Sequence, residues 1–169
     1  MGLAMNELTP VLIAIGSNID REQKLPQALA ALKGQPELSL RAVSPIYESL
    51  PVGAGVEQPL FFNAAALIET RLGPVNLKAM LLTIEANLGR VRNGDKYAPR
   101  PIDLDIALYG QQILELHGRH IPDPDILSLP HLALPLADVA PDWTHPELGL
   151  TLQEIAKRLN FSAKEIKQL

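Results

Sequence analysis

The sequence contains no cysteine, which excludes disulfide bonds and thiolate metal sites. It also lacks an excess of positive charge: the formal net charge is -4, so the composition gives no indication of a nucleic-acid partner. No apolar stretch approaches the ~20 residues that a membrane-spanning helix needs. The first residues lack a basic segment followed by an apolar core, so we expect no signal peptide, no membrane partner and a cytoplasmic location.

The sequence does contain enough apolar side chains for a folded domain. Its 169 residues are 47% hydrophobic, and this length and composition favour one domain with a substantial core. We expect a flexible leader over residues 1–10, a single domain over residues 11–160 and a C-terminal tail over residues 161–169. We also expect the protein to be a monomer.

Hydrophobic periodicity predicts the order strand, helix, strand, strand, helix, strand. The expected strands cover residues 11–15, 38–50, 61–70 and 100–108, and the expected helices cover residues 21–32 and 74–88. This order favours an α+β fold with a largely antiparallel sheet and a ferredoxin-like βαββαβ core. Residues 118–146 contain six prolines and are expected to form loops with short helical pieces. Thr151 and Glu154 form a capping box before a final helix.

Two acidic residues, Asp103 and Asp105, stand in a strongly apolar stretch. Side chains alternate along a strand, so these carboxylates share one face. The other face is expected to carry the apolar residues Ile102, Leu104, Ile106 and Leu108. Carboxylates about 7 Å apart repel each other, and a bound cation removes the repulsion. Mg²⁺ suits such a pair, because it commonly takes one or two carboxylates together with substrate phosphates.

Four basic residues lie just before the acidic pair: Arg90, Arg92, Lys96 and Arg100. Arginine near the end of a helix is often explained by the helix dipole alone, and that explanation suffices for Arg90. It explains Arg92 less well, since the following loop adds still more positive charge. Cationic loops beside a metal site commonly hold polyphosphates. The simpler alternative, a solvated sheet face with ordinary surface charges, stays open on these residues alone.

Three polar features carry weaker signals. Asn63 interrupts the apolar run 61–65, and its amide is either a satisfied core group or a reader of a flat heterocycle. Glu85 falls on the polar side of the second predicted helix and taken alone would be a surface residue. The segment 16–18 follows a strand but lacks a phosphate-loop pattern, so we expect a tight turn there.

Taken in order, the motifs of this chain resemble one enzyme family. They are Ala14–Asn18, Phe62–Ala65, Glu85 with Gly89–Arg92, and Arg100–Asp105. Together they are similar to 6-hydroxymethyl-7,8-dihydropterin pyrophosphokinase of folate biosynthesis, and the similarity runs from about residue 11 to about residue 159. The resemblance implies a three-layer α/β/α sandwich around the ferredoxin-like core. It also implies ATP as pyrophosphate donor, the hydroxymethyldihydropterin as acceptor, AMP as product, and two Mg²⁺ ions held by Asp103 and Asp105.

The resemblance further implies roles for individual side chains. The pterin is expected to contact Ser49, Val52, Phe61, Asn63 and His131. The nucleotide is expected to contact Glu85, Arg92, Tyr97, Arg100 and Ile106. The implied catalytic residues are the two metal ligands together with Arg90 and Arg92, and Arg90 falls in the mobile catalytic loop that closes over the substrates.

The chain departs from the family pattern after residue 110. Many members carry a histidine, an arginine and an aromatic residue at positions where this chain has Asp123, Leu129 and His131. His131 could still stack on the pterin, whereas the missing arginine removes one expected phosphate contact. Two other functions remain as alternatives: a different Mg²⁺-dependent transferase with an Asp-x-Asp pair, and a non-catalytic ligand-binding domain of ferredoxin-like fold.

Overall fold

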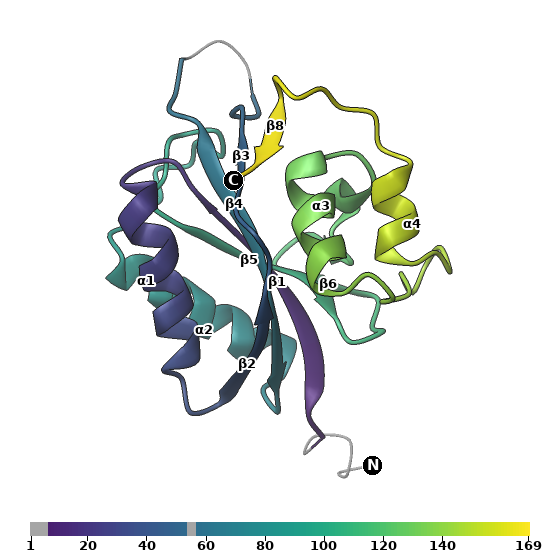
Figure 1. Cartoon of the computed structure of the whole chain (residues 1–169). Helices are drawn as coiled ribbons and strands as arrows, with labels where there is room; N and C mark the ends of the chain where they lie inside the picture. The colour runs from purple at the N-terminus through teal and green to yellow at the C-terminus, as the bar shows by residue number, and fades with distance from the viewer. Residues whose placement is uncertain (1–6, 54–56) are drawn as a thin grey trace.

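The computed structural model describes residues 7–53 and 57–169, and one antiparallel sheet forms its centre (Figure 1). The sheet has six strands in the order β5-β1-β4-β3-β8, with β2 also paired to β4. They are β1 (Thr9–Ser17), β2 (Leu38–Val43), β3 (Tyr47–Ser49), β4 (Phe61–Thr70), β5 (Asp103–Tyr109) and β8 (Ile166–Gln168). Every pair is antiparallel, as the sequence predicted.

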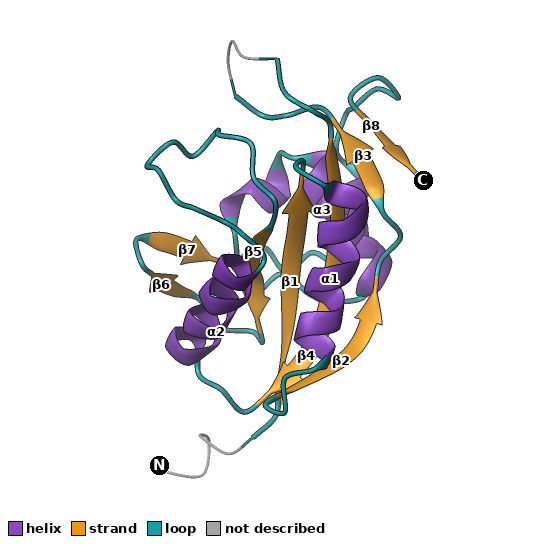
Figure 2. Ribbon diagram, turned by 90° about the vertical axis from the view of Figure 1, so that its left-hand side faces the viewer, coloured by secondary structure: helices purple, strands orange, loops and turns teal. Residues whose placement is uncertain are grey.

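Helices cover both faces of this sheet and so make three layers (Figures 1 and 2). On one face lie α1 (Arg21–Lys33) and α2 (Pro74–Asn87), and on the other lie α3 (Pro130–Val139) and α4 (Leu152–Lys157). Alternate residues of β1 therefore enter two different cores, with Ile13 on the α1 and α2 side and Leu12 on the other. The predicted α+β class is confirmed, and the spatial order β5-β1-β4-β2 is that of a split βαβ fold.

The single strand expected over residues 38–50 is two strands. β2 pairs with the end of β4 and β3 pairs with its beginning, and residues 44–46 separate them. Pro45 has no N–H for the ladder, which favours a break at this point. Ser44, between β2 and β3, holds this part of the chain against β4. Its N–H donates to the Ala65 carbonyl over 2.9 Å, and its hydroxyl accepts from the Ala65 N–H over 2.9 Å.

A β-bulge changes which face the end of β5 presents. Ile13 of β1 is opposite Ile106, whereas the preceding Leu12 is opposite Leu108, so Ala107 is an extra residue in β5. Ile106 therefore packs toward α1 and α2, and Leu108 packs in the core beneath α3 and α4. The prediction that Leu108 shares a face with Ile106 was wrong, because a period of two cannot reveal an inserted residue.

Residues 110–130 are more ordered than their prolines suggested. They form a hairpin of β6 (Leu114–Leu116) and β7 (Arg119–Ile121), then a 3₁₀ turn η2 (Pro124–Leu127). The ten-residue helix α3 follows, with Pro130 in its first turn, where a backbone N–H is not needed. The expectation of loops with short helical pieces therefore underestimated the regular secondary structure of this region.

The C-terminal part of the chain completes the sheet. The capping box is confirmed, since the Thr151 hydroxyl accepts from the Glu154 N–H over 3.1 Å and the Glu154 carboxylate accepts from the Thr151 N–H. Beyond α4, the segment expected as a tail contains β8, which pairs with β3. Across residues 7–53 and 57–169, the helices are all too short or too polar to cross a membrane.

Candidate active site

A cavity of about 740 Å³ opens on the face of the sheet that α3 covers, within the size range of small-molecule sites. The end of β1, the starts of β4 and β5 and two loops contribute to its wall. One is the β3–β4 loop, which the structure describes over residues 50–53 and 57–60, and the other is the basic loop, residues 88–102. The strand register fixes its floor, because Gly16 of β1 lies opposite Asn63 of β4 and opposite Asp103 of β5.

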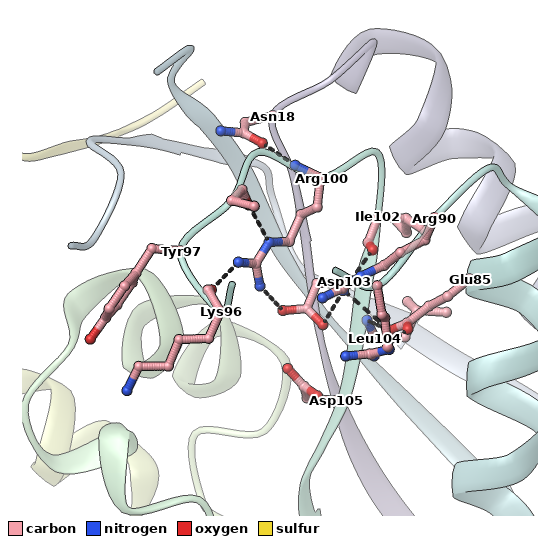
Figure 3. A network of polar contacts seen from close by, with 12 residues as sticks. Asn18, Glu85, Arg90, Lys96, Tyr97, Arg100, Ile102, Asp103, Leu104 and Asp105 are labelled. Atoms are coloured by element: carbon pink, nitrogen blue, oxygen red, sulfur yellow. Dashed lines mark hydrogen bonds and ion pairs between the residues drawn. The ribbon is translucent and has the colours of Figure 1, made fainter. Parts of the chain in front are cut away.

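Asp103 lies at the start of β5 between two arginines of the basic loop (Figure 3). Its Oδ1 accepts a hydrogen bond from Arg90 over 2.8 Å, and its Oδ2 accepts one from Arg100 over 3.3 Å. Burial alone would raise the pKa of this carboxyl, but the charges of Arg90 and then Arg100 outweigh it and hold the pKa below its ordinary value. Asp103 is therefore an anion at neutral pH.

The negative charge of Asp105 is less well compensated than that of Asp103, although two cationic side chains contact it. Lys78 Nζ lies 3.3 Å and Arg119 Nη1 lies 3.2 Å from its Oδ1. Burial, followed by the negative charge of Asp103, raises the pKa of Asp105 from 3.8 to about 6. The predicted face shared by the two carboxylates is confirmed, since both line the cavity.

Glu85 is buried, so the reading of this residue alone as a surface group was wrong. Its side chain is 1% exposed at the end of α2. One carboxylate oxygen accepts from Arg92 Nη2 over 2.7 Å, and the other accepts from the backbone N–H of Leu104 over 2.7 Å. Arg90 Nη1 is 3.7 Å from the same carboxylate. Glu85 thus joins α2, β5 and the basic loop behind the two aspartates.

The five residues expected at the pterin all line the cavity: Ser49, Val52, Phe61, Asn63 and His131. The Asn63 amide is buried, and its Nδ2 donates to Ser49 Oγ over 2.7 Å. Asn63 is therefore both a hydrogen-bonded core amide and part of the cavity wall. Burial lowers the pKa of His131, which keeps its imidazole neutral near pH 7.

Only some of the residues expected to contact the nucleotide line the cavity. Tyr97 and Arg100 line the cavity, whereas Arg92 is paired with Glu85 and is 53% exposed. The Ile106 side chain is buried in the core and borders a separate cavity of about 20 Å³ near Lys78. The side chains of Glu85, Arg92 and Ile106 do not face the cavity. These residues could contact a nucleotide only through their backbone atoms or after a rearrangement of the basic loop.

Asn18 connects both loops of the cavity, a role that the prediction of a tight turn did not include. Its Oδ1 accepts from the backbone N–H of Arg100 over 2.8 Å. Its Nδ2 donates to Gln58 Oε1 and to the Pro59 carbonyl, each over 3.1 Å. The basic loop and the β3–β4 loop are therefore held by one buried amide.

The region that departs from the family pattern brings a further cation to the cavity. Asp123, Leu129 and Arg119 all line it, and Arg119 Nη2 lies 3.2 Å from Asp123 Oδ2. Burial raises the pKa of the Asp123 carboxyl. Arg119 was not predicted to lie at the site, because a single arginine outside any sequence motif gives no indication of its position.

The number of protein ligands at the aspartate pair is compatible with Mg²⁺. Within residues 7–53 and 57–169, His, Cys, Asp and Glu form no group of three or more able to hold a metal ion. Asp103 and Asp105 can therefore supply only part of a coordination shell. Mg²⁺ accepts such a site, because it keeps waters and takes phosphate oxygens as ligands. Paired carboxylates, cationic side chains and a neighbouring cavity are typical of enzymes that transfer phosphoryl groups.

Comparison with known proteins agrees with this class. The profile of the 7,8-dihydro-6-hydroxymethylpterin-pyrophosphokinase (HPPK) family matches residues 12–141. A Pseudomonas aeruginosa protein named 2-amino-4-hydroxy-6-hydroxymethyldihydropteridine pyrophosphokinase is 38% identical over 156 residues, covering 92% of this chain and 94% of that protein. A Bacillus subtilis protein of the same name is 39% identical over 128 residues, covering 75% of each.

The fold is also that of a solved structure. The crystal structure of Plasmodium falciparum HPPK-DHPS with pteroate matches with a TM-score of 0.68 at 13% identity. The match covers 90% of this chain and 42% of that longer chain, and at this identity it concerns the fold alone. On the family match and the identities above, the chain belongs to the HPPK family.

Proposed function

We propose that the protein transfers pyrophosphate from ATP to 6-hydroxymethyl-7,8-dihydropterin, giving AMP and the pterin diphosphate in tetrahydrofolate biosynthesis. Membership of the HPPK family carries this proposal. We further propose that it acts as a cytoplasmic monomer with a single catalytic domain and with no nucleic-acid or membrane partner.

The pterin would occupy the end of the cavity near Asn63. Ser49 and Val52 would complete the polar edge, and Phe61 and His131 would pack against the ring. Two strand spacings separate Asn63 from Asp103 across Gly16, which is about 10 Å. A pterin held at Asn63 would therefore direct its hydroxymethyl group toward the carboxylates.

Two Mg²⁺ ions held by Asp103 and Asp105 would neutralise phosphate charge and orient the reacting groups. Arg100 and Tyr97 both line the cavity and would hold the triphosphate and nucleotide. Arg100 contacts Asp103 in the structure. Phosphate oxygens would compete for that guanidinium, because arginine binds phosphate with paired hydrogen bonds.

The hydroxymethyl oxygen would attack the β-phosphorus in line and release its proton to solvent. The bond from that phosphorus to the oxygen bridging the α-phosphate would break, and AMP would leave with the bridging oxygen. We assign no side chain the role of general base, and we propose that positioning and electrostatics supply most of the rate. Arg90 and Arg92 would act after the basic loop closes, and closure would exclude water from the reacting phosphates.

One assay tests the proposal: AMP release from ATP and Mg²⁺ by the purified protein, with and without the pterin. We expect AMP only when 6-hydroxymethyl-7,8-dihydropterin is present. Pyrophosphate or a nucleoside diphosphate as the product would indicate a different Asp-x-Asp transferase. Pterin binding without any nucleotide turnover would indicate a binding domain.

A further inference from the structure

Lys78 is a cation of the site that no motif of the sequence indicated. It lies in α2, whose neighbouring residues Leu77 and Leu81 are fully buried in the core. Its Nζ is 3.3 Å from Asp105 Oδ1 and 3.4 Å from the Leu104 carbonyl oxygen. The side chain is only 14% exposed, so α2 holds the ammonium group against β5.

Each of the two aspartates has two cationic side chains close to it. Arg90 and Arg100 lie on Asp103, and Lys78 and Arg119 lie on Asp105. The two partners of Asp105 differ in freedom, because the Arg119 side chain is 55% exposed and the Lys78 side chain is 14% exposed. Arg119 can turn toward a bound phosphate, whereas Lys78 must remain beside the carboxylate.

We propose that Lys78 is a fixed internal counter-ion of Asp105 that weakens divalent-cation binding until a nucleotide is bound. The inference rests on the proposed function in that it takes Asp103 and Asp105 as the metal ligands. An ammonium group 3.3 Å from a ligand oxygen repels a divalent ion at that oxygen, and partial burial limits screening of the repulsion. The negative charge of ATP phosphates offsets it, so the metal binds with the nucleotide rather than before it.

The test measures Mn²⁺ binding to the nucleotide-free protein at pH 8 by electron paramagnetic resonance. This pH lies well above the pKa of about 6 of Asp105, so the carboxylate is ionised. We expect Lys78→Met to bind Mn²⁺ roughly tenfold more tightly than the wild type, because the buried positive charge is gone. Lys78→Arg, which restores the charge, should bind within about twofold of the wild type.

Two controls assign the effect to this position. Lys33→Met removes a lysine that is exposed at the end of α1 and should leave Mn²⁺ binding unchanged. Adding Asp105→Asn to Lys78→Met should abolish the gain, because the affected ligand is then missing. Should Lys78→Met fail to fold by circular dichroism, the same titration with Lys78→Gln decides the question.

Unchanged or weaker Mn²⁺ binding in the folded, neutral variant would overturn the proposal and leave Lys78 a structural contact. A gain that survives Asp105→Asn would also overturn it. The outcome is separate from that of the proposed function, because the titration involves no turnover. Absence of pterin-dependent AMP release together with the expected Mn²⁺ result would reject the reaction and keep the counter-ion.

Discussion

The carboxylate of Glu85 accepts a 2.7 Å hydrogen bond from the backbone N–H of Leu104, the residue between the two proposed metal ligands. This contact fixes the distance between the end of α2 and the start of β5. The same carboxylate binds Arg92, so it also anchors the basic loop. One buried acid thus sets both the strand that carries the aspartates and the loop that carries the arginines.

Replacing Glu85 should damage stability and activity together. Glu85→Ala leaves the buried Leu104 N–H without its acceptor, and we expect a loss of about 2–4 kcal/mol in the free energy of unfolding, measured by urea denaturation. Glu85→Gln keeps an acceptor for Leu104 but loses the charge facing Arg92, so it should lose less. Equal stability of the alanine variant and the wild type would contradict the role assigned to this hydrogen bond.

Asp105→Ala should nearly abolish turnover. We expect pterin-dependent AMP release to fall at least about 100-fold, because one of the two proposed metal ligands is removed. Asp20→Ala, at an exposed position before α1, is a matched control and should retain activity. Near-normal kcat in the Asp105 variant would reject the metal assignment.

Arg90→Ala should lower kcat while leaving the Kd for ATP, measured by titration calorimetry, nearly unchanged. Arg90 donates to Asp103 and to the Ile102 carbonyl in the structure, so its proposed contact with the reacting phosphates would form only after loop closure. Arg71→Ala, at an exposed position, controls for loss of positive charge. A large loss of ATP binding with unchanged kcat would place Arg90 in the ground-state site.

The pKa of Asp105 predicts a pH dependence of metal binding. Below about pH 6 protons compete for this carboxyl, so the half-saturating Mn²⁺ concentration should rise by about tenfold per pH unit and stay flat above it. The stability of the metal-free protein should change in the opposite sense. A carboxyl with a raised folded pKa destabilises the fold where it is ionised, and this loss is relieved as the pH falls from 6 toward 3.8.

Melting temperatures between pH 4 and pH 7 check the stability part of that prediction. Asp105→Asn cannot titrate at this position, so the variant should lack the contribution that the wild type shows. An identical dependence in both proteins would assign it to other groups.

Variants of Asn18 should distinguish the contributions of the two loops of the cavity to substrate binding. Asn18→Asp keeps the acceptor for the Arg100 N–H but removes the donor to Gln58 and Pro59. We expect it to raise the KM for the pterin more than that for ATP, and Asn18→Ala to raise both. Asn76→Ala, exposed on α2, should change neither. Equal effects of the aspartate and alanine variants would show that the two loops respond as one.

The acidic pair was predictable because alternation along a strand requires only local sequence. Asp103 and Asp105 share a face and line the cavity as expected. The same rule misplaced Leu108, since a bulge at Ala107 depends on pairing with β1. The order of the first helices and strands along the chain was predictable, because most of them show a clear period.

Residues that reach the site from a distance were not predictable. Glu85 occupies the polar side of a helix, and only the position of β5 turns that side into a buried one. Arg119 arrives on a hairpin that the prolines of residues 118–146 concealed, and Lys78 is one lysine among several on the surface of helices. Their roles depend on which elements pack together, and no short motif records that.

The alignment of Asn63, Gly16 and Asp103 across three strands has a consequence for substrate choice. Backbone hydrogen bonds hold this separation, so side-chain movements cannot adjust it. With the pterin at its proposed position beside Asn63, this fixed separation limits which acceptors can react. We expect a pterin whose hydroxyl lies one carbon farther from the ring to bind with similar affinity and to react poorly, because its oxygen would lie beyond the position of the β-phosphorus.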